Sequence, residues 1–168
     1  MTLTVCGYTF EFDGAVDAIE LGEAATRDHS DMQLVAFAVE FDDRYVFVEL
    51  VPPKAAAKGV KAEGEFCARL KSERLCDELA RKYRDSMFFH SHGGTTPKPV
   101  EYAVLYAPEG IDEILVTVLE DELKRRIPLS HPVWREDSAD SCSVMTVNQW
   151  HKRFGADSLA VASPSAGR

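Results

Sequence analysis

The feature that most constrains the fold is a pair of apolar runs with three charged residues between them. Gln33 to Phe41 and Tyr45 to Val51 are rich in Val and Phe, and Asp42-Asp43-Arg44 separates them. β-branched and aromatic residues favour strands, and two such runs joined by a short polar turn are typical of a β-hairpin. We therefore expect this hairpin at the centre of a β-sheet.

A long amphipathic helix is predicted after the hairpin. Pro52-Pro53 ends the second strand, because proline has no N–H group to give to the ladder. From about Glu65 to Arg84, apolar residues recur at helical spacing and charged residues occupy the other face. The apolar positions are Phe66, Leu70, Cys76, Leu79, Ala80 and Tyr83. We expect this helix to pack its apolar face on the sheet.

Shorter elements are predicted elsewhere from local composition. The strand candidates are Thr2 to Cys6, Tyr8 to Phe12, Met87 to Ser91, Glu113 to Leu119 and Ser143 to Val147. The helix candidates are Ala15 to Thr26, Glu120 to Arg126 and a turn that Asn148 caps and that ends at Phe154. Strands and helices mix without a regular alternation, so the predicted fold class is α+β with a mixed or antiparallel sheet.

The length of 168 residues suits one domain with a proper core. We expect that domain to cover residues 1–154. After Gly155 the residues are small and polar, which predicts a flexible or partner-docked C-terminal tail over residues 155–168.

Charge and apolar content restrict the classes of partner. The chain has 19 Lys and Arg against 28 Asp and Glu, a net charge of -9, which opposes binding to nucleic acid. No run of about 18 apolar residues is present, and the N-terminus lacks the pattern of a signal peptide. We expect a cytoplasmic protein that does not bind membranes, with a protein partner.

The four cysteines form no CxxC pair and are expected to be reduced and mostly buried.

The stretch His90-Ser91-His92-Gly93-Gly94 is the main candidate site. On a strand, alternate side chains share a face, so the two imidazoles would point the same way with Cα atoms roughly 6.6 to 7 Å apart. Two histidines in this arrangement can bind zinc if another side chain completes the set. The candidates for that side chain are Glu101, Glu40, Glu49, His29 and Asp31.

The predicted order of a helix, a hairpin, a long helix and a strand ending in His90-Ser91-His92 resembles the JAMM/MPN metalloproteases. The resemblance covers roughly Ala15 to Tyr106. It implies that His90 and His92 bind zinc and that an upstream glutamate, Glu40 or Glu23, is the general base in the hydrolysis of peptide or isopeptide bonds. The family's proline, serine and aspartate are replaced by Gly93, Val100 and Ala103. Glu101 lies two residues before the aspartate position and would be the third ligand.

Other interpretations of the same residues stay open. The histidines can be the polar end of a strand, and the following glycines can form a turn or an anion-binding nest near Lys98. Cys142 can pair with His131 or His151 as a nucleophile and base. The two tryptophans, Trp134 and Trp150, lie near Val133 and Phe154 in sequence and can form a partner-binding patch or part of the core.

Two functions therefore follow from the sequence. The first is a zinc-dependent hydrolase with Glu40 as general base and with His90, His92 and Glu101 as metal ligands. The second is a non-enzymatic, acidic binding or assembly protein, such as an adaptor, an inhibitor or a subunit of a larger complex. The second function would use the acidic surface and the C-terminal tail.

Overall fold

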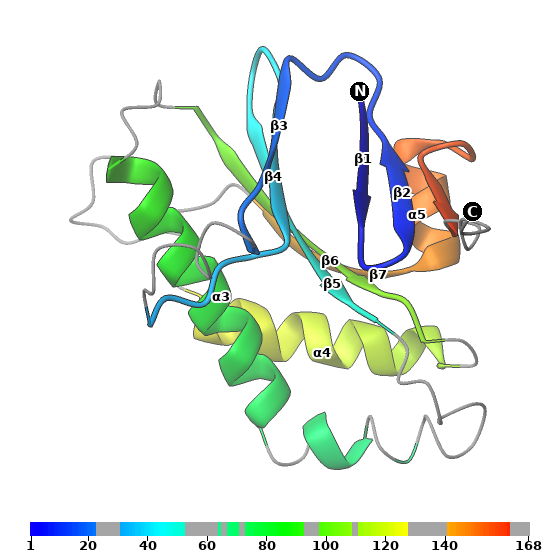
Figure 1. Cartoon of the computed structure of the whole chain (residues 1–168). Helices are drawn as coiled ribbons and strands as arrows, with labels where there is room; N and C mark the ends of the chain where they lie inside the picture. Colours follow the sequence, from blue (N-terminus) through cyan, green and yellow to red (C-terminus); the bar gives the residue numbers. More distant parts are fainter. Residues whose placement is uncertain are drawn as a thin grey trace, which may run out of the picture.

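The described residues form two β-sheets with helices packed on them (Figure 1). The computed structural model describes residues 1–22, 31–52, 64, 67–70, 73–92, 98–108, 111–127 and 141–161. The larger sheet has the strand order β3-β4-β5-β6-β7, and the smaller one has the order β1-β2-β8. The strands are β1 (Thr2–Val5), β2 (Tyr8–Glu11), β3 (Asp17–Glu20), β4 (Phe37–Glu40), β5 (Tyr45–Val51), β6 (Val100–Tyr106), β7 (Ser141–Thr146) and β8 (Leu159–Val161). The helices that pack on these sheets are α3 (Arg74–His92), α4 (Glu113–Arg126) and α5 (Val147–Phe154).

The predicted central hairpin is confirmed. Strands β4 and β5 pair antiparallel, with Phe37 opposite Val48 and Glu40 opposite Tyr45. Strand β5 then pairs in parallel with β6, and β6 pairs in parallel with β7. Parallel neighbours need a crossover connection, and here α3 lies between β5 and β6 in the chain and α4 lies between β6 and β7. The sheet is therefore mixed, and the α+β fold class is confirmed.

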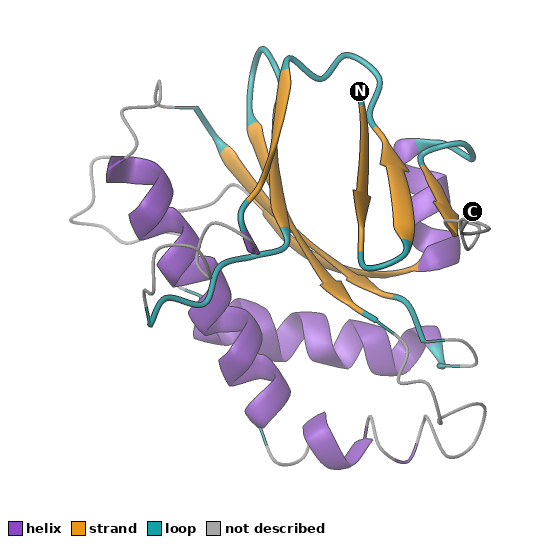
Figure 2. Cartoon of the chain, in the orientation of Figure 1, coloured by secondary structure: helices purple, strands orange, loops and turns teal. Residues whose placement is uncertain are grey.

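The larger sheet is covered on both faces (Figure 2). On one face, Phe47 and Tyr102 pack in a hydrophobic cluster with Leu79 of α3 and Leu119 of α4. On the other face, the small sheet and α5 contribute to a second cluster, in which Trp150 is fully buried. Because both faces of β5 are buried, its residues form a continuous apolar run with the single exception of Glu49.

The prediction of a helix over Ala15 to Thr26 is wrong where the structure describes it. Asp17–Glu20 is strand β3, which pairs antiparallel with β4. The residues favour a helix locally, but the free edge of β4 offers a partner strand, and tertiary pairing overrides local propensity. Residues 23–26 lie outside the described part of the chain.

The prediction of a strand over Glu113 to Leu119 is also wrong, because these residues begin α4. The Asp112 side chain accepts a hydrogen bond from the Ile114 backbone N–H at 2.9 Å and caps the helix. Val116, Leu119 and Leu123 then recur at helical spacing on the buried face. Glu120 to Arg126 continues this helix and is not a separate one.

The long amphipathic helix exists with different limits. Glu73 has a φ of 61°, and α3 begins only after it, at Arg74, and runs to His92. Met87 to Ser91, predicted as a strand, is thus the last part of α3. Glu65 and Phe66, at the predicted start, lie outside the described residues.

The chain ends partly follow the sequence prediction. The opening hairpin of β1 and β2 is confirmed, as are β7 and α5, although Thr146 rather than Asn148 caps α5. Leu159–Val161, predicted as part of the tail, is strand β8 and pairs with β2. Residues 162–168 lie outside the described part. Among the described residues, no helix has the length and apolar character needed to cross a membrane.

Candidate functional site at the carboxyl edge of the sheet

The two histidines of the predicted metal site point in different directions. They lie two positions apart on a helix rather than on a strand, and such residues do not face each other. The His90 ring packs edge-on against Tyr45, with ring centres 4.4 Å apart. The His92 ring is exposed and lies over Phe88 at 4.3 Å. The expectation that the imidazoles share a face is wrong.

Glu101, the predicted third ligand, is engaged elsewhere. Its carboxylate lies 3.6 Å from the Arg44 guanidinium and 3.0 Å from that of Arg153. Within the part of the chain that the structure describes, no three His, Cys, Asp or Glu side chains are grouped to hold a metal ion. His29 lies outside that part. The arrangement of the described residues therefore does not fit the predicted zinc site.

Glu40 and His90 are brought together, as neighbours of one small cavity. This cavity of about 40 Å³ is also lined by Ile19 and Tyr45. Lys98 Nζ donates a hydrogen bond to Glu40 Oε1 at 2.5 Å, and this bond lowers the pKa of the Glu40 carboxyl. Burial lowers the pKa of His90. A carboxylate with a lowered pKa is a weak base, so this ion pair does not suit Glu40 to the role of general base.

The proposed pairing of cysteine and histidine is not formed by the described residues. Cys142 is buried in the helix-side cluster, and burial raises its pKa to about 12. A thiol with this pKa carries almost no thiolate at neutral pH, so it is a poor nucleophile. His131 and Trp134 lie outside the described residues. Trp150 belongs to the core and not to an exposed patch.

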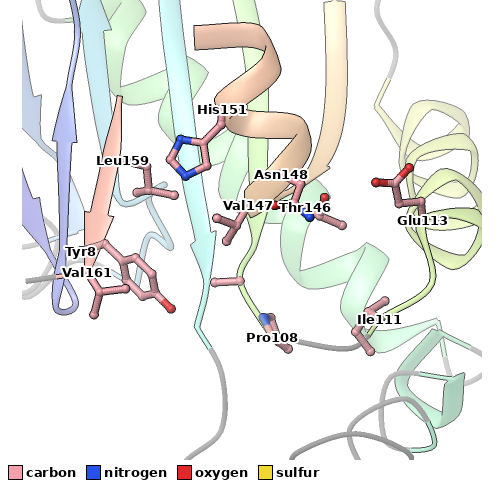
Figure 3. A pocket seen from close by; sticks show the side chains of 11 residues that line it. Tyr8, Pro108, Ile111, Glu113, Thr146, Val147, Asn148, His151, Leu159 and Val161 are labelled. Carbon is pink, nitrogen blue, oxygen red and sulfur yellow. The ribbon is translucent and has the colours of Figure 1, made fainter. Parts of the chain in front are cut away.

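A larger cavity lies at a place that the sequence did not indicate. It has a volume of about 380 Å³ and opens where β6 and β7 end and where α4 and α5 begin (Figure 3). Its lining residues are Tyr8, Ala107, Pro108, Ile111, Glu113, Thr146, Val147, Asn148, His151, Leu159 and Val161. In sheets with parallel strands, ligands bind in the crevice outside the carboxyl ends of the strands. We therefore take this cavity, the carboxyl-edge pocket, as the candidate functional site.

The start of α5 gives the pocket hydrogen-bonding groups. Thr146 and Gln149 form a capping box, in which the Thr146 hydroxyl accepts from the Gln149 backbone N–H at 3.3 Å. The backbone N–H groups of Val147 and Asn148, which come earlier in the helix, have no acceptor within it. Both residues line the pocket. A ligand with a hydrogen-bond acceptor is suited to this side.

The rest of the pocket combines polar side chains with an apolar surface. His151 Nδ1 lies 3.4 Å from the carbonyl oxygen of Gly155, which can only accept. In the neutral tautomer that carries its proton on Nδ1, Nε2 is an acceptor. Leu159 and Val161 of β8 lie with Tyr8 on one side of the pocket, and His151 projects from α5 (Figure 3). Ala107 is buried and contributes apolar surface. This mixture of a few polar groups and apolar walls is typical of small-molecule sites.

Sequence reasoning missed this pocket because it missed strand β6. Val100–Tyr106 is a seven-residue strand, six residues of which are buried. The run Val-Glu-Tyr-Ala-Val-Leu-Tyr, followed by Ala107-Pro108, is a signal for a strand and its end. The same residues also resemble a diverged metal-ligand motif, which competes with the strand signal. Of the lining residues, the sequence marks His151 as a candidate base and Asn148 as a candidate helix cap.

Comparisons of the chain with protein-family models, with curated proteins and with solved structures found no match. The resemblance to the JAMM/MPN family thus stays a prediction from the sequence. Two of the elements on which it depends are different in the structure. The first predicted helix contains strand β3, and His90 and His92 lie on helix α3.

Proposed function

We propose that this protein is a non-enzymatic binding protein that holds a small organic ligand in the carboxyl-edge pocket. The observation that carries the proposal is the cavity of about 380 Å³ outside β6 and β7. Its volume is within the range of about 300 to 1,000 Å³ found for small-molecule pockets. This proposal differs from both functions expected from the sequence, since the binding protein expected there contacts protein partners through its acidic surface and C-terminal tail.

The lining indicates the chemistry of the ligand. An apolar body can contact Ala107, Leu159 and Val161, and an acceptor group can face the backbone N–H groups at the start of α5. Glu113 lines the pocket from the first turn of α4. Its carboxylate repels a ligand that carries two negative charges. We therefore expect a neutral or singly charged molecule with one aromatic or aliphatic ring system.

The zinc-hydrolase function gains no support from the described residues. Its two histidines lie on different sides of α3, and Glu101 contacts two arginines. Glu40 is held by Lys98 as an ion pair. None of these side chains lines the carboxyl-edge pocket.

The proposal is tested with three probes that share one ring system and differ in charge. These are 1-naphthylacetate, 1-naphthylacetamide and 2-(1-naphthyl)ethylamine, each titrated into the ¹⁵N-labelled protein and followed by amide chemical shifts. We expect the acetate and the amide to shift the resonances of Ala107, Asn148 and His151, and the amine to bind more weakly. Absence of shifts with all three probes, or shifts spread over the whole surface, would overturn the proposal.

A pair of variants on α5 locates the binding. Asn148→Trp places a large ring at the rim of the pocket, whereas Lys152→Trp places the same ring at an exposed position outside the lining. We expect the first variant to lose probe binding and the second to keep it. Equal binding by both variants would exclude the carboxyl-edge pocket as the site.

A further inference from the structure

Strand β3 forms one edge of the larger sheet and displays apolar side chains there. It pairs with β4 on one side, and the described residues include no strand on its other side. Ile19 is 55% exposed and Val16, just before the strand, is 54% exposed. Exposed edges of this kind are templates for pairing with another chain, and proteins usually protect them.

The backbone of β3 carries a donor that points away from β4. Hydrogen bonds to a single neighbour alternate along an antiparallel strand, so every second residue directs its N–H and C=O outward. The Ala18 N–H donates to the carboxylate of Asp17 at 2.8 Å rather than to the ladder. Because Asp17 is exposed, the Ala18 N–H can instead donate to a backbone carbonyl oxygen of a partner strand.

A side-chain notch lies directly beside this edge. Ile19 lines the cavity of about 40 Å³ together with Asp17, Leu21 and His90. The notch therefore combines an apolar wall with an acidic rim. Its size suits the stem of one long side chain, and Asp17 is exposed at the entrance.

We infer that the edge of β3 accepts an extended, basic segment of a partner protein as an added strand. The main chain of the segment pairs with β3, and the stem of a Lys or Arg lies against Ile19 with its charge near Asp17. The two charged residues of β3, Asp17 and Glu20, are both acidic, and the whole chain carries a net charge of -9. A peptide that adds a strand to a sheet gains affinity from main-chain hydrogen bonds and specificity from side-chain pockets of this kind.

Charge also argues against a second copy of this chain as the occupant. Two copies of β3 would bring the acidic side chains Asp17 and Glu20 of both chains to one edge, and each chain carries a net charge of -9. Like charges gathered at an interface repel each other. A basic segment has the complementary sign at both positions.

The test measures the binding of three fluorescein-labelled peptides to the full chain by fluorescence anisotropy. The first is Thr-Val-Lys-Val-Arg-Val-Thr, the second has Glu in place of Lys and Arg, and the third is the basic peptide with alternate backbone nitrogens methylated. We expect the basic peptide alone to bind measurably, with the other two weaker by about tenfold or more. Equal binding of the methylated peptide would overturn strand addition, and equal binding of the acidic peptide would overturn the basic partner.

Two variants of β3 and one control place the binding. Ala18→Pro removes the outward donor, and Ile19→Lys adds a repelling charge at an exposed position. Thr4→Lys adds the same charge at an exposed position of strand β1 in the other sheet. We expect both β3 variants to lose the basic peptide and Thr4→Lys to bind it normally. Ile19→Lys keeps the test valid if Ala18→Pro fails to fold, and unchanged binding by Ile19→Lys would overturn the inference.

Analytical ultracentrifugation tests whether a second copy of this chain, rather than a partner protein, occupies the edge of β3. A dimer of the full chain that dissociates in Ile19→Lys would assign the edge to a second copy and would overturn the basic partner. A monomer that binds the basic peptide supports the inference. Asn148→Trp, which blocks the carboxyl-edge pocket, should bind this peptide normally, so this inference and the proposed function can fail separately.

Discussion

Removing the counter-ion of a buried carboxylate should destabilise this protein in a pH-dependent way. Glu49 of β5 is 5% exposed, and its Oε1 accepts from Lys82 Nζ of α3 at 2.6 Å. Its other oxygen accepts from the Ala36 backbone N–H at 3.1 Å. Burial raises the pKa of Glu49, and Lys82 opposes that rise. Lys82→Met keeps most of the side-chain stem and removes the charge.

The magnitude follows from the exposure of the two partners. Leaving a fully buried charge without its partner costs about 3 to 5 kcal/mol, whereas an exposed pair is worth about 1 kcal/mol or less. The Glu49 side chain is 6% exposed but that of Lys82 is 32% exposed, so water reaches one partner. We expect Lys82→Met to lower the free energy of unfolding by about 2 kcal/mol at pH 8, and Tm by about 4 to 8 °C.

The sign of the pH dependence follows from the raised pKa. Protonated Glu49 needs no counter-ion, so the stability linked to it is present below its unfolded-state pKa of about 4.3 and is lost as the pH rises through the folded-state pKa. Lys82→Met removes an influence that lowers the pKa of Glu49 and raises that pKa further. The cost of the mutation should therefore be largest at pH 8 and should shrink toward pH 4.5.

Urea unfolding followed by circular dichroism at pH 8.0, 6.0 and 4.5 measures this cost. Arg84→Met, which removes an exposed charge from the same helix, should change stability by less than about 0.5 kcal/mol at each pH. Adding Glu49→Gln to Lys82→Met should restore most of the loss, because a neutral amide still accepts from Ala36. A cost that is the same at all three pH values, or no recovery in the double variant, would refute the reasoning.

Three further predictions concern the core, the thiols and the start of α5. Leu119→Ala, at a fully buried position of α4, should lower the free energy of unfolding in urea by about 2 to 5 kcal/mol, whereas the exposed Val118→Ala should cost much less. Cys6 is exposed and Cys142 buried with a pKa of about 12, so Ellman's reagent at pH 8 should modify Cys6 quickly and Cys142 only after denaturation; equal rates would contradict the structure. Thr146→Ala removes the α5 cap and should cost about 1 kcal/mol, measured by thermal unfolding, and an unchanged Tm would show that the capping box is not formed.

The histidine pair shows that a spacing in the sequence predicts a shared face only when the type of element is known. His90 and His92 share a face on a strand and lie on different sides of a helix, so the sequence spacing alone supports a metal site only if the element type is known. The run of apolar residues before His90 suits a strand end and the end of an amphipathic helix equally well. Packing of α3 on the sheet decided between them, and it placed the His90 ring on Tyr45.

The sequence by itself determined the elements whose signals are local and complete. The hairpin of β4 and β5 follows from two apolar runs and a polar turn, and β1, β2, β7 and the α+β class follow from similar signals. Only the tertiary structure decided that Asp17–Glu20 is a strand, that Glu113–Arg126 is a helix and that the carboxyl-edge pocket exists. The physical reason is that these features depend on partners distant in sequence. Strand β3 needs the edge of β4, α4 needs the apolar face of the sheet, and the pocket needs the ends of β6 and β7 to lie beside β2 and β8.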